Sequence, residues 1–335
     1  DFCLSRGLGD VYKRQVQYRD SDATAIEGDV WYNSTAGKLR MYSAVGSWAS
    51  GGTITTGRKG MGSSGATNTA AMIFGGDPLP TRDNSETYDG SSWTEGANLN
   101  SGRGFLGGTG TSTAALAIGG WIGPGSSAPT NSKLHEYWNG TSWTELADQN
   151  TARAEGGSCG TSTAALWIGG KVFPNTKQDI VEEWNGTSWT EVADLVEVSH
   201  LHSPASQGTV TAALIAGGAD QGGTKQSETE SWDGSSWTEV ADLNANKQQA
   251  IGAGTQTSAI VASGSLVPPG LLTESWDGLS WTEVGDMVGA ARYWTGGCGS
   301  SSSAFSAGGI APPGALPTIS EEWDMAATLQ TVAFD

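Results

Sequence analysis

Two of the three histidines in this chain, His200 and His202, are separated by a single residue. On a β-strand this spacing would point both imidazoles to one face of a sheet, where they could hold a metal ion, because strand side chains alternate between faces. A metal site needs further ligands, and the remaining histidine, His135, lies far away in the sequence. We therefore expect these histidines to be polar loop or strand-start residues, and we predict no metal and no cofactor.

Catalysis by carboxylates or by a nucleophile has little support in the sequence. Glycosidases need two acidic side chains at a defined separation. The acidic residues in the variable loops described below are few: Asp77, Asp83, Asp179 and Asp220. A serine or cysteine nucleophile needs a base beside it, and no such arrangement is indicated. We therefore expect no enzymatic activity.

The composition excludes several classes of partner. The chain has 335 residues, of which 35 are acidic and 17 basic, and its net charge of −18 would repel nucleic acid and anionic lipid surfaces. No apolar stretch reaches the roughly 18 residues that a membrane-spanning helix needs. The 50 glycines argue against long helices as the main material. We expect no nucleic-acid partner and no membrane insertion.

The segments that carry the polar residues repeat along the chain. A short apolar stretch ends in Gly-Gly or Ser-Gly six times, with 44 to 50 residues from one pair to the next. An aromatic residue follows each pair, and in the first five copies a tryptophan follows five positions later, as in Trp138 and Trp143. The pairs are Gly75-Gly76, Gly119-Gly120, Gly169-Gly170, Gly217-Gly218, Ser263-Gly264 and Gly308-Gly309.

Each copy predicts four strands, which we call a to d in chain order. Strands a and b are short and rich in small apolar residues, as strands buried between neighbours are. Strand c ends in the first aromatic residue, and Asn-Gly or Asp-Gly then turns the chain into strand d, because these residues accept a positive φ. The turn should pair Trp138 with Trp143 across the two strands. Four strands per repeat without a helix predict one blade of a β-propeller.

The glycine pair, the aromatic residue and the tryptophan, repeated with a period near 50 residues, resemble the kelch family. The resemblance covers about residues 38 to 335. It implies an all-β fold, a six-bladed kelch-type β-propeller of four-stranded antiparallel blades. The alternative of seven blades would need an inner strand before Asp29, and the sequence shows none there. Two segments could supply strand d of the sixth blade, namely residues 46–52 around Trp48 or residues 328–334.

Two N-terminal segments are interpreted separately from the propeller at residues 46–335. Residues 1–15 lack the glycine and threonine rhythm of the rest and resemble a translated sequencing adapter, or else a disordered tail. Residues 16–45 overlap a segment, Gly28 to Trp48, that resembles a hairpin of phage fibre and tail-associated proteins. The repeat text NGTSWTEVADL is similar to kelch-like repeats in marine tailed bacteriophages. Together these resemblances indicate a viral sequence from environmental DNA, a metagenome.

The resemblance also raises two classes of propeller enzyme. Galactose-oxidase-like enzymes need copper held by two tyrosines and two histidines, and the sparse histidines do not fit that set. Sialidase-type propellers carry an S-x-D-x-G-x-x-W box, whereas Asp and Gly are adjacent here, as in Asp89-Gly90. Cys159 and Cys298 each lie ten positions before a glycine pair, on blades that would face each other across the ring, so we expect free thiols.

One face of the propeller should vary more than the other. Successive strands alternate in direction, so the b–c and d–a connections emerge on one face and the a–b and c–d turns on the other. The a–b and c–d turns keep their length, whereas the b–c loops differ in length and composition. These loops carry apolar residues that could bind a partner or could cap their own blade edge: Leu79, Trp121, Phe173, Val267 and Leu271.

The same face should carry a basic ring at the mouth of the central channel. One basic residue or histidine lies ten or eleven positions after each strand-d tryptophan, near the start of strand a: Arg58, Arg103, Arg153, His200, Lys247 and Arg292. These side chains could hold an acidic sugar or another anion. Alternatively, each could pair with a carboxylate of the preceding strand d, such as Asp148, Asp194 or Asp242.

The sequence therefore predicts a non-enzymatic binding module that is virion-associated or extracellular. The favoured interpretation is a phage tail or fibre appendage that binds a host-surface glycan or protein, or another virion protein. The alternatives are a carbohydrate-active propeller enzyme and a cellular kelch-type scaffold for protein binding. A fold alone does not decide between these classes.

Overall fold

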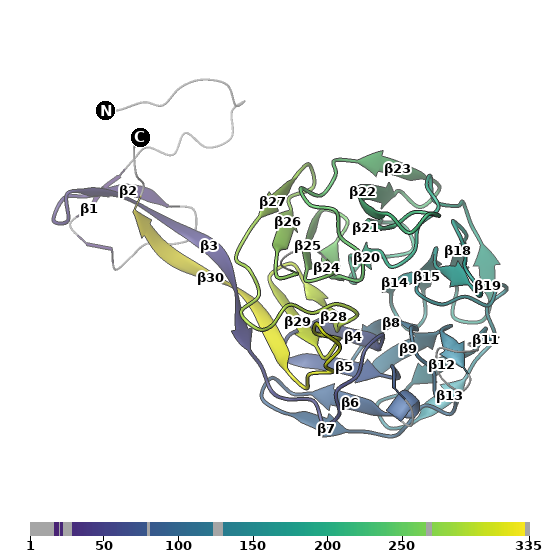
Figure 1. Cartoon of the computed structure of the whole chain (residues 1–335). Helices are drawn as coiled ribbons and strands as arrows, with labels where there is room; N and C mark the ends of the chain where they lie inside the picture. Colours follow the sequence, from purple (N-terminus) through teal and green to yellow (C-terminus); the bar gives the residue numbers. More distant parts are fainter. Residues whose placement is uncertain are drawn as a thin grey trace. The chain divides into compact units, whose positions relative to one another are not determined.

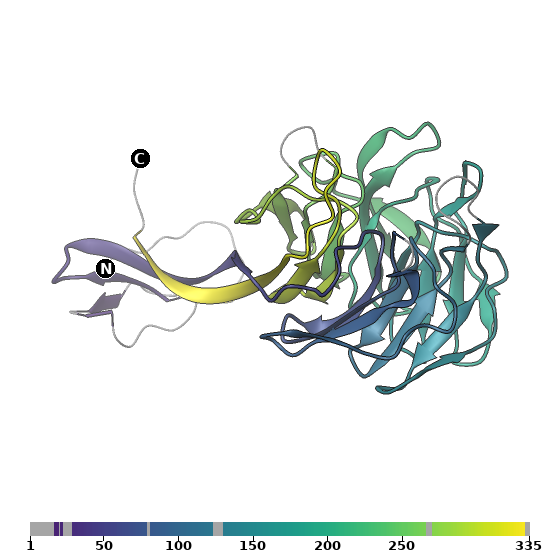
Figure 2. The ribbon, with the colours of Figure 1, turned by 60° about the horizontal axis from the view of Figure 1, so that its bottom comes forward.

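The computed structural model of the chain describes residues 17–19, 21–22, 29–78, 81–122, 130–265 and 270–331. These residues form an all-β structure in which one short 3-10 helix, η1 (Thr81–Asp83), is the only helical element described. Residues 48–324 form one compact unit, a six-bladed β-propeller (Figures 1 and 2). The prediction of six four-stranded antiparallel blades is confirmed, and the alternative of seven blades is wrong.

The blades follow one another around the ring in chain order, each with strand a nearest the axis. Blade 1 contains β4 (Gly62–Thr67), β5 (Ala70–Phe74), β6 (Ser85–Tyr88) and β7 (Trp93–Glu95). Blade 2 contains β8 (Gly107–Thr111), β9 (Ala114–Ile118), β12 (His135–Trp138) and β13 (Trp143–Glu145). Blade 3 contains β14 (Gly157–Gly160), β15 (Ala165–Ile168), β18 (Val181–Trp184) and β19 (Trp189–Glu191).

The second half of the ring has the same order. Blade 4 contains β20 (Ser203–Pro204), β21 (Ala213–Ala219), β22 (Lys225–Trp232) and β23 (Trp237–Val240). Blade 5 contains β24 (Ile251–Thr255), β25 (Ser258–Ala262), β26 (Thr273–Trp276) and β27 (Trp281–Glu283). Blade 6 contains β28 (Gly296–Ser300), β29 (Ser303–Ala307) and the first residues of β30 (Ser320–Thr331). Two b–c loops form small hairpins, β10 (Trp121–Ile122) with β11 (Thr130–Asn131) and β16 (Lys171–Val172) with β17 (Thr176–Lys177).

The sixth blade takes its outer strand from the N-terminal side of the chain. The end of β3 (Lys38–Ser50) lies beside β30, and the rings of Trp48 and Trp323 are 5.6 Å apart. The Gly51 N–H donates to the Ser320 carbonyl at 2.9 Å. Residues 46–52 therefore close the ring, whereas residues 328–331 continue β30.

The hydrophobic core is divided among the six interfaces between neighbouring blades. Trp138 and Trp143 face each other across strands c and d as predicted, with ring centroids 5.4 Å apart. They pack against Met72 and Phe74 from strand b of blade 1. Each of the other interfaces has a similar cluster of buried residues. The repeated tryptophans therefore join each blade to the one before it.

The glycine pairs mark where the next blade approaches strand b. Gly119 has φ +59°, and a Cβ on it would lie 2.6 Å from the Arg153 carbonyl oxygen of the next blade. The following N–H, that of Gly120, donates to the same carbonyl at 2.9 Å. Side chains rarely adopt this backbone conformation, and here they would also clash, so glycine is required.

A second compact unit comprises the residues before Trp48 and after Asp324. In it, β2 (Val30–Asn33) pairs with β3 as an antiparallel hairpin, and β1 (Gln17–Arg19) pairs with β2 in parallel. Trp31 is fully buried and donates its indole N–H to Asp22 Oδ1 at 3.0 Å. No helix in the described part of the chain has the length and apolar character that crossing a membrane requires.

Candidate binding site at the mouth of the central channel

The predicted basic ring needs correction, because all six of its side chains are buried and five of them form ion pairs inside the blades. Arg103 is fully buried and makes an ion pair at 3.0 Å with Glu136 on strand c of its own blade. Its guanidinium also donates to the Gly119 carbonyl at 3.1 Å. The same ion pair recurs as Arg58–Glu86, Arg153–Glu182, Lys247–Glu274 and Arg292–Glu321.

These ion pairs hold the fold together and leave no open anion site. Each glutamate also accepts N–H groups from the d–a connection, as Glu136 does from Asn100 at 2.8 Å. The alternative of pairing was therefore the correct one, but the carboxylate comes from strand c and not from the preceding strand d. Removing either member of such a pair would leave the other charge buried without a partner, which is strongly destabilising.

The fourth blade departs from this pattern. Ser199 occupies the position of the basic residue, because its carbonyl accepts the Gly170 N–H just as the carbonyl of Arg153 accepts that of Gly120. His200 lies one residue further along the chain, and its Nδ1 lies 2.9 Å from the Ala219 carbonyl. Among the described residues, the corresponding glutamate, Glu230, accepts only the N–H groups of Val196 and Glu197, at 2.8 and 3.2 Å, and burial raises its pKa. Burial lowers the pKa of His200 to about 4, so its imidazole is neutral at pH 7.

A closed belt of backbone hydrogen bonds encircles the axis just beyond these residues. In each blade one residue donates its N–H to the carbonyl of the corresponding residue in the preceding blade, at 2.6 to 3.1 Å. All six have a positive φ, between 55° and 62°. The six residues are Gly60, Phe105, Glu155, Leu201, Gln249 and Trp294. Five of them are not glycine, although this conformation costs a side-chain-bearing residue about 1–2 kcal/mol.

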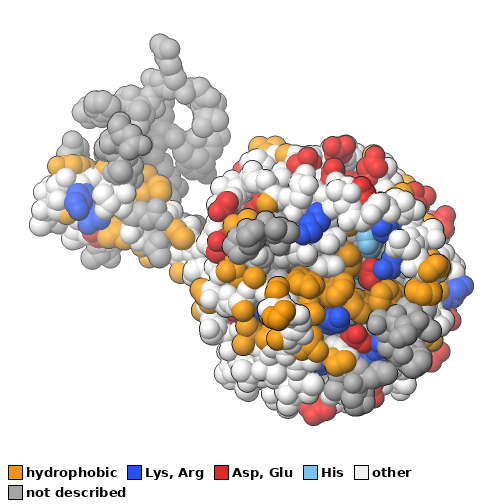
Figure 3. Space-filling model, viewed as in Figure 1, with side chains coloured by type: hydrophobic (Ala, Val, Ile, Leu, Met, Phe, Trp, Pro, Cys, Tyr) orange, Lys and Arg blue, Asp and Glu red, His pale blue; other side chains and the backbone are white. Residues whose placement is uncertain are grey.

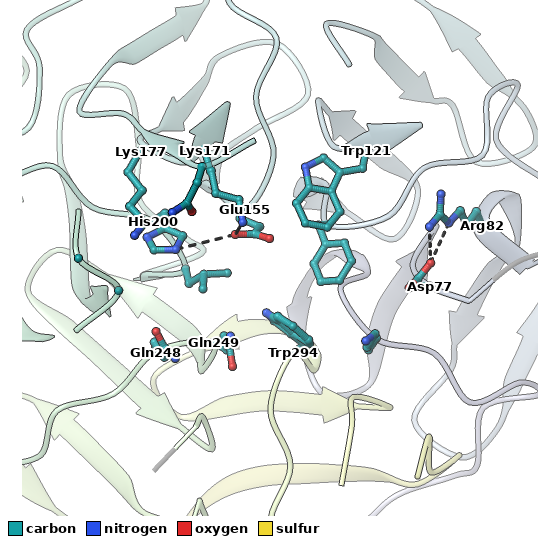
Figure 4. A pocket seen from close by; sticks show the side chains of 16 residues that line it. Asp77, Arg82, Trp121, Glu155, Lys171, Lys177, His200, Gln248, Gln249 and Trp294 are labelled. Atoms are coloured by element: carbon teal, nitrogen blue, oxygen red, sulfur yellow. Dashed lines mark hydrogen bonds and ion pairs between the residues drawn. The ribbon is translucent and has the colours of Figure 1, made fainter. Parts of the chain in front are cut away.

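The belt places five different side chains at the axis, because its sixth residue, Gly60, has none. These side chains line a cavity of about 490 Å³ on the face that carries the b–c and d–a connections (Figure 4). Residues of the b–c loops form its outer wall, including Asp77, Arg82, Trp121, Lys171 and Lys177. The volume lies in the range of small-molecule sites, roughly 300–1,000 Å³.

Three aromatic rings lie at the floor and wall of this cavity. Phe105 is 4.6 Å from Trp121 and 5.0 Å from Trp294, measured between ring centroids. The indole N–H groups of both tryptophans are buried and have no acceptor among the described residues. Figure 3 shows hydrophobic side chains gathered over the centre of this face, with acidic side chains mostly toward its edge. The site therefore offers apolar ring faces together with unused donors.

Charged groups surround the three rings. Lys171 pairs with Glu155 at 2.9 Å, and its Nζ lies 5.0 Å from the Trp121 ring centroid. Lys59 Nζ lies 4.8 Å from the centroid of Trp294. Glu155 is almost fully buried, and burial raises its pKa while Lys171 opposes that shift. Both lysines are therefore held against aromatic faces, where cation–π attraction orients them.

The predicted loop residues have different fates. Trp121 lines the cavity, whereas Phe173 is 42% exposed and Leu271 packs against the core between blades 5 and 6. Leu79 and Val267 lie outside the described residues. The sequence analysis did not identify Phe105, Glu155 and Trp294 as site residues. Each lies two positions after the recurring basic residue, and the difference between the copies at this position is the sequence feature that could have identified them.

The two other predicted chemistries can be located in the structure. Cys159 and Cys298 are buried and free, as expected, and burial raises the pKa of Cys159 to about 12. His202 is buried beside a smaller cavity of about 100 Å³ on the inner side of the belt, and neither of its ring nitrogens has a partner among the described residues. No group of three metal-ligating side chains occurs in the part of the chain that the structure describes.

The fold and the cavity define a six-bladed β-propeller with a lined pocket on its axis. The chain is similar in structure to one described as "Structure of YjhT", with a TM-score of 0.68 and 13% sequence identity. The likeness covers 83% of this chain and 99% of that chain, and at this identity it shows the fold alone. No protein-family model matches the sequence, and no curated protein matches it.

Proposed function

We propose that this protein is a non-enzymatic, kelch-type binding module that takes a saccharide of a host cell surface into the cavity on its axis. We propose further that it is virion-associated or extracellular and belongs to a phage tail or fibre. The sequence resemblance to kelch-like phage repeats supports this second part. One observation supports the binding site: the belt presents five different side chains and one glycine on a scaffold that otherwise repeats.

Selection for folding alone does not explain the belt. A glycine would fit the positive φ at all six positions, yet five positions carry larger side chains. Aromatic rings with nearby polar donors suit sugars, because a sugar ring has an apolar face and a hydroxyl edge. Residues in strained conformations also cluster at binding sites more than elsewhere. The belt is therefore best explained as a platform for a ligand.

The proposal is tested by binding of the purified protein to an immobilised panel of bacterial surface oligosaccharides. Trp121→Ala and Trp294→Ala should each weaken binding by about thirtyfold, which corresponds to about 2 kcal/mol for the loss of an aromatic anchor. Leu279→Ala is the matched control, because Leu279 is 82% exposed on the c–d turn of blade 5. Circular dichroism and thermal melting would establish that all three variants fold.

Three results would contradict the proposal. Binding that is lost in the Leu279 variant but kept in both tryptophan variants would place the site on the opposite face. Binding to purified virion proteins and to no saccharide would replace the glycan with a protein partner. Turnover of a panel saccharide would show that the protein is an enzyme.

A further inference from the structure

We propose that the axial cavity selects a saccharide residue that bears a single anionic group, and that Lys59 binds that group. This inference rests on the proposed function and adds the chemical class of its ligand. Three observations support it: the local charge of the cavity, the state of Lys59, and the two unused indole donors.

The cavity has the opposite charge to the rest of the protein. Lys59, Arg82, Lys171 and Lys177 line it together with two acidic side chains, Asp77 and Glu155, so its net charge is +2. The whole chain carries −18. Charges beyond about 8 Å are largely screened at physiological ionic strength, so a ligand in the cavity experiences mainly the local positive charge. A long polyanion would instead extend over the acidic surface and be repelled.

Among the described residues, Lys59 is the one basic side chain of the cavity whose charged group makes no ion pair or hydrogen bond, since Arg82 pairs with Asp77. Lys171 is held by Glu155 at 2.9 Å, and Lys177 is largely buried and donates to the Gln221 carbonyl at 2.7 Å. Within the described residues, the close contacts of the Lys59 ammonium are with rings, at 4.8 Å from Trp294 and 5.9 Å from Phe105. An ammonium in this position can form a charge-assisted hydrogen bond with an incoming carboxylate or sulfate.

The indole N–H groups of Trp121 and Trp294 add the polar contacts that a sugar needs. Both nitrogens are buried without an acceptor among the described residues. An unsatisfied buried donor costs free energy, so a ligand oxygen that accepts from it gains more than one that replaces water at an exposed donor. Phe105 lies between the two tryptophans and supplies the apolar surface.

The direct test uses saccharides in matched pairs. Carboxylated oligosaccharides are compared with their methyl esters, and sulfated ones with their unsulfated forms, on the same immobilised panel. We expect the anionic member of a pair to bind at least tenfold more tightly, and the two sets of pairs show whether carboxylate or sulfate is preferred. Equal binding of both members, or preference for the neutral one, overturns this inference and leaves the proposed function intact. Binding to no saccharide at all overturns both.

Lys59→Met tests the assigned residue, because methionine keeps an unbranched side chain of similar length and removes the charge. We expect a loss of at least tenfold for the anionic saccharide and little change for its neutral partner. Lys133→Met is the matched control, since Lys133 is exposed and does not line the cavity. An equal loss for both members of a pair, or a loss as large in the Lys133 variant, refutes the role of Lys59.

Discussion

At the scale of single residues, five blades bury a glutamate with a cation and the fourth blade buries the equivalent glutamate without one among the described residues, so the two environments can be compared within one protein. Arg153 is fully buried against Glu182, whereas Glu230 in the fourth blade is buried and forms no ion pair with any residue that the structure describes. The same glutamate position is therefore compensated in one blade and uncompensated in the next. Its substitution should have opposite consequences in the two blades.

Glu182→Gln should destabilise the propeller by about 3–5 kcal/mol at pH 7, because it leaves the Arg153 guanidinium buried without its partner. Glu230→Gln should instead be neutral or stabilising, since it removes a buried charge that has only backbone donors. Urea denaturation of both variants at pH 7 measures the difference. A similar loss in both variants would show that the backbone hydrogen bonds, and not the cation, decide the stability of this position.

The stability difference between Glu230→Gln and the wild type should increase with pH. Burial raises the folded-state pKa of Glu230 above its unfolded value, so the folded state binds the proton more tightly. The wild type therefore loses stability as pH rises from the unfolded pKa through the folded one. The advantage of Glu230→Gln should be present at neutral pH and disappear near pH 4 and below, and an advantage that grows on acidification would contradict this assignment.

At the scale of strands and turns, the glycine pairs determine how closely the blades approach. A Cβ on Gly169 would lie 2.6 Å from the Ser199 carbonyl oxygen, and its φ is +55°. In blade 5 the equivalent residue is Ser263, which has φ +68° and donates its hydroxyl to the Arg292 carbonyl. The fifth blade therefore accommodates a side chain at this position because the Ser263 hydroxyl forms a hydrogen bond with the carbonyl that it approaches.

This contrast predicts an asymmetric outcome for a pair of exchanges. Gly169→Ser should cost at least 2 kcal/mol, from the unfavourable φ and the clash with the neighbouring carbonyl. Ser263→Gly should change the stability by less than about 1 kcal/mol, because relief of the unfavourable φ offsets the loss of one hydrogen bond. Chemical denaturation of both variants is the measurement. If Gly169→Ser were as stable as the wild type, the blades would be able to move apart more easily than the geometry implies.

The same elements show how much could be predicted from the sequence. The tryptophan pairs and glycine pairs recur six times, and each encodes a local contact, so the blades and their number were predictable. The site was only partly predictable. The repeat places the backbone of Arg103 and Arg153 near the axis, so the sequence predicted them as channel residues. The direction of their side chains depends on Glu136 and Glu182, which lie about 30 residues later in the chain.

The belt was harder to predict for a related physical reason. Phe105 adopts a positive φ because its N–H donates to Gly60 and its carbonyl accepts from Glu155, and both partners belong to other blades. Nothing in the neighbouring sequence specifies that conformation. The only local sign is that the position varies while its surroundings repeat, which is a feature of function more than of folding.

At the scale of the whole propeller, stability depends on joining the two ends of the ring. Trp48 is buried, packs 5.6 Å from Trp323, and donates its indole N–H to Thr273 at 2.9 Å. Trp48 therefore fills the core between blades 5 and 6, as Trp143 fills the core between blades 1 and 2. The interface that closes the ring has the same kind of core as the interfaces within it, although its strands come from opposite ends of the sequence.

Trp48→Ala should therefore cost about 3–5 kcal/mol, as expected for a large aromatic removed from a packed core, and Trp143→Ala should cost about the same. Removing residues 1–45 should leave the propeller nearly as stable as the whole chain, because Trp48 and the contacts of Gly51 remain. Removing residues 1–56 should destabilise it strongly, because blade 6 then lacks its outer strand. Thermal melting of the four variants separates these cases. If the longer truncation melted like the shorter one, closure by β3 would contribute little, and the remaining five blade interfaces alone would hold the ring together.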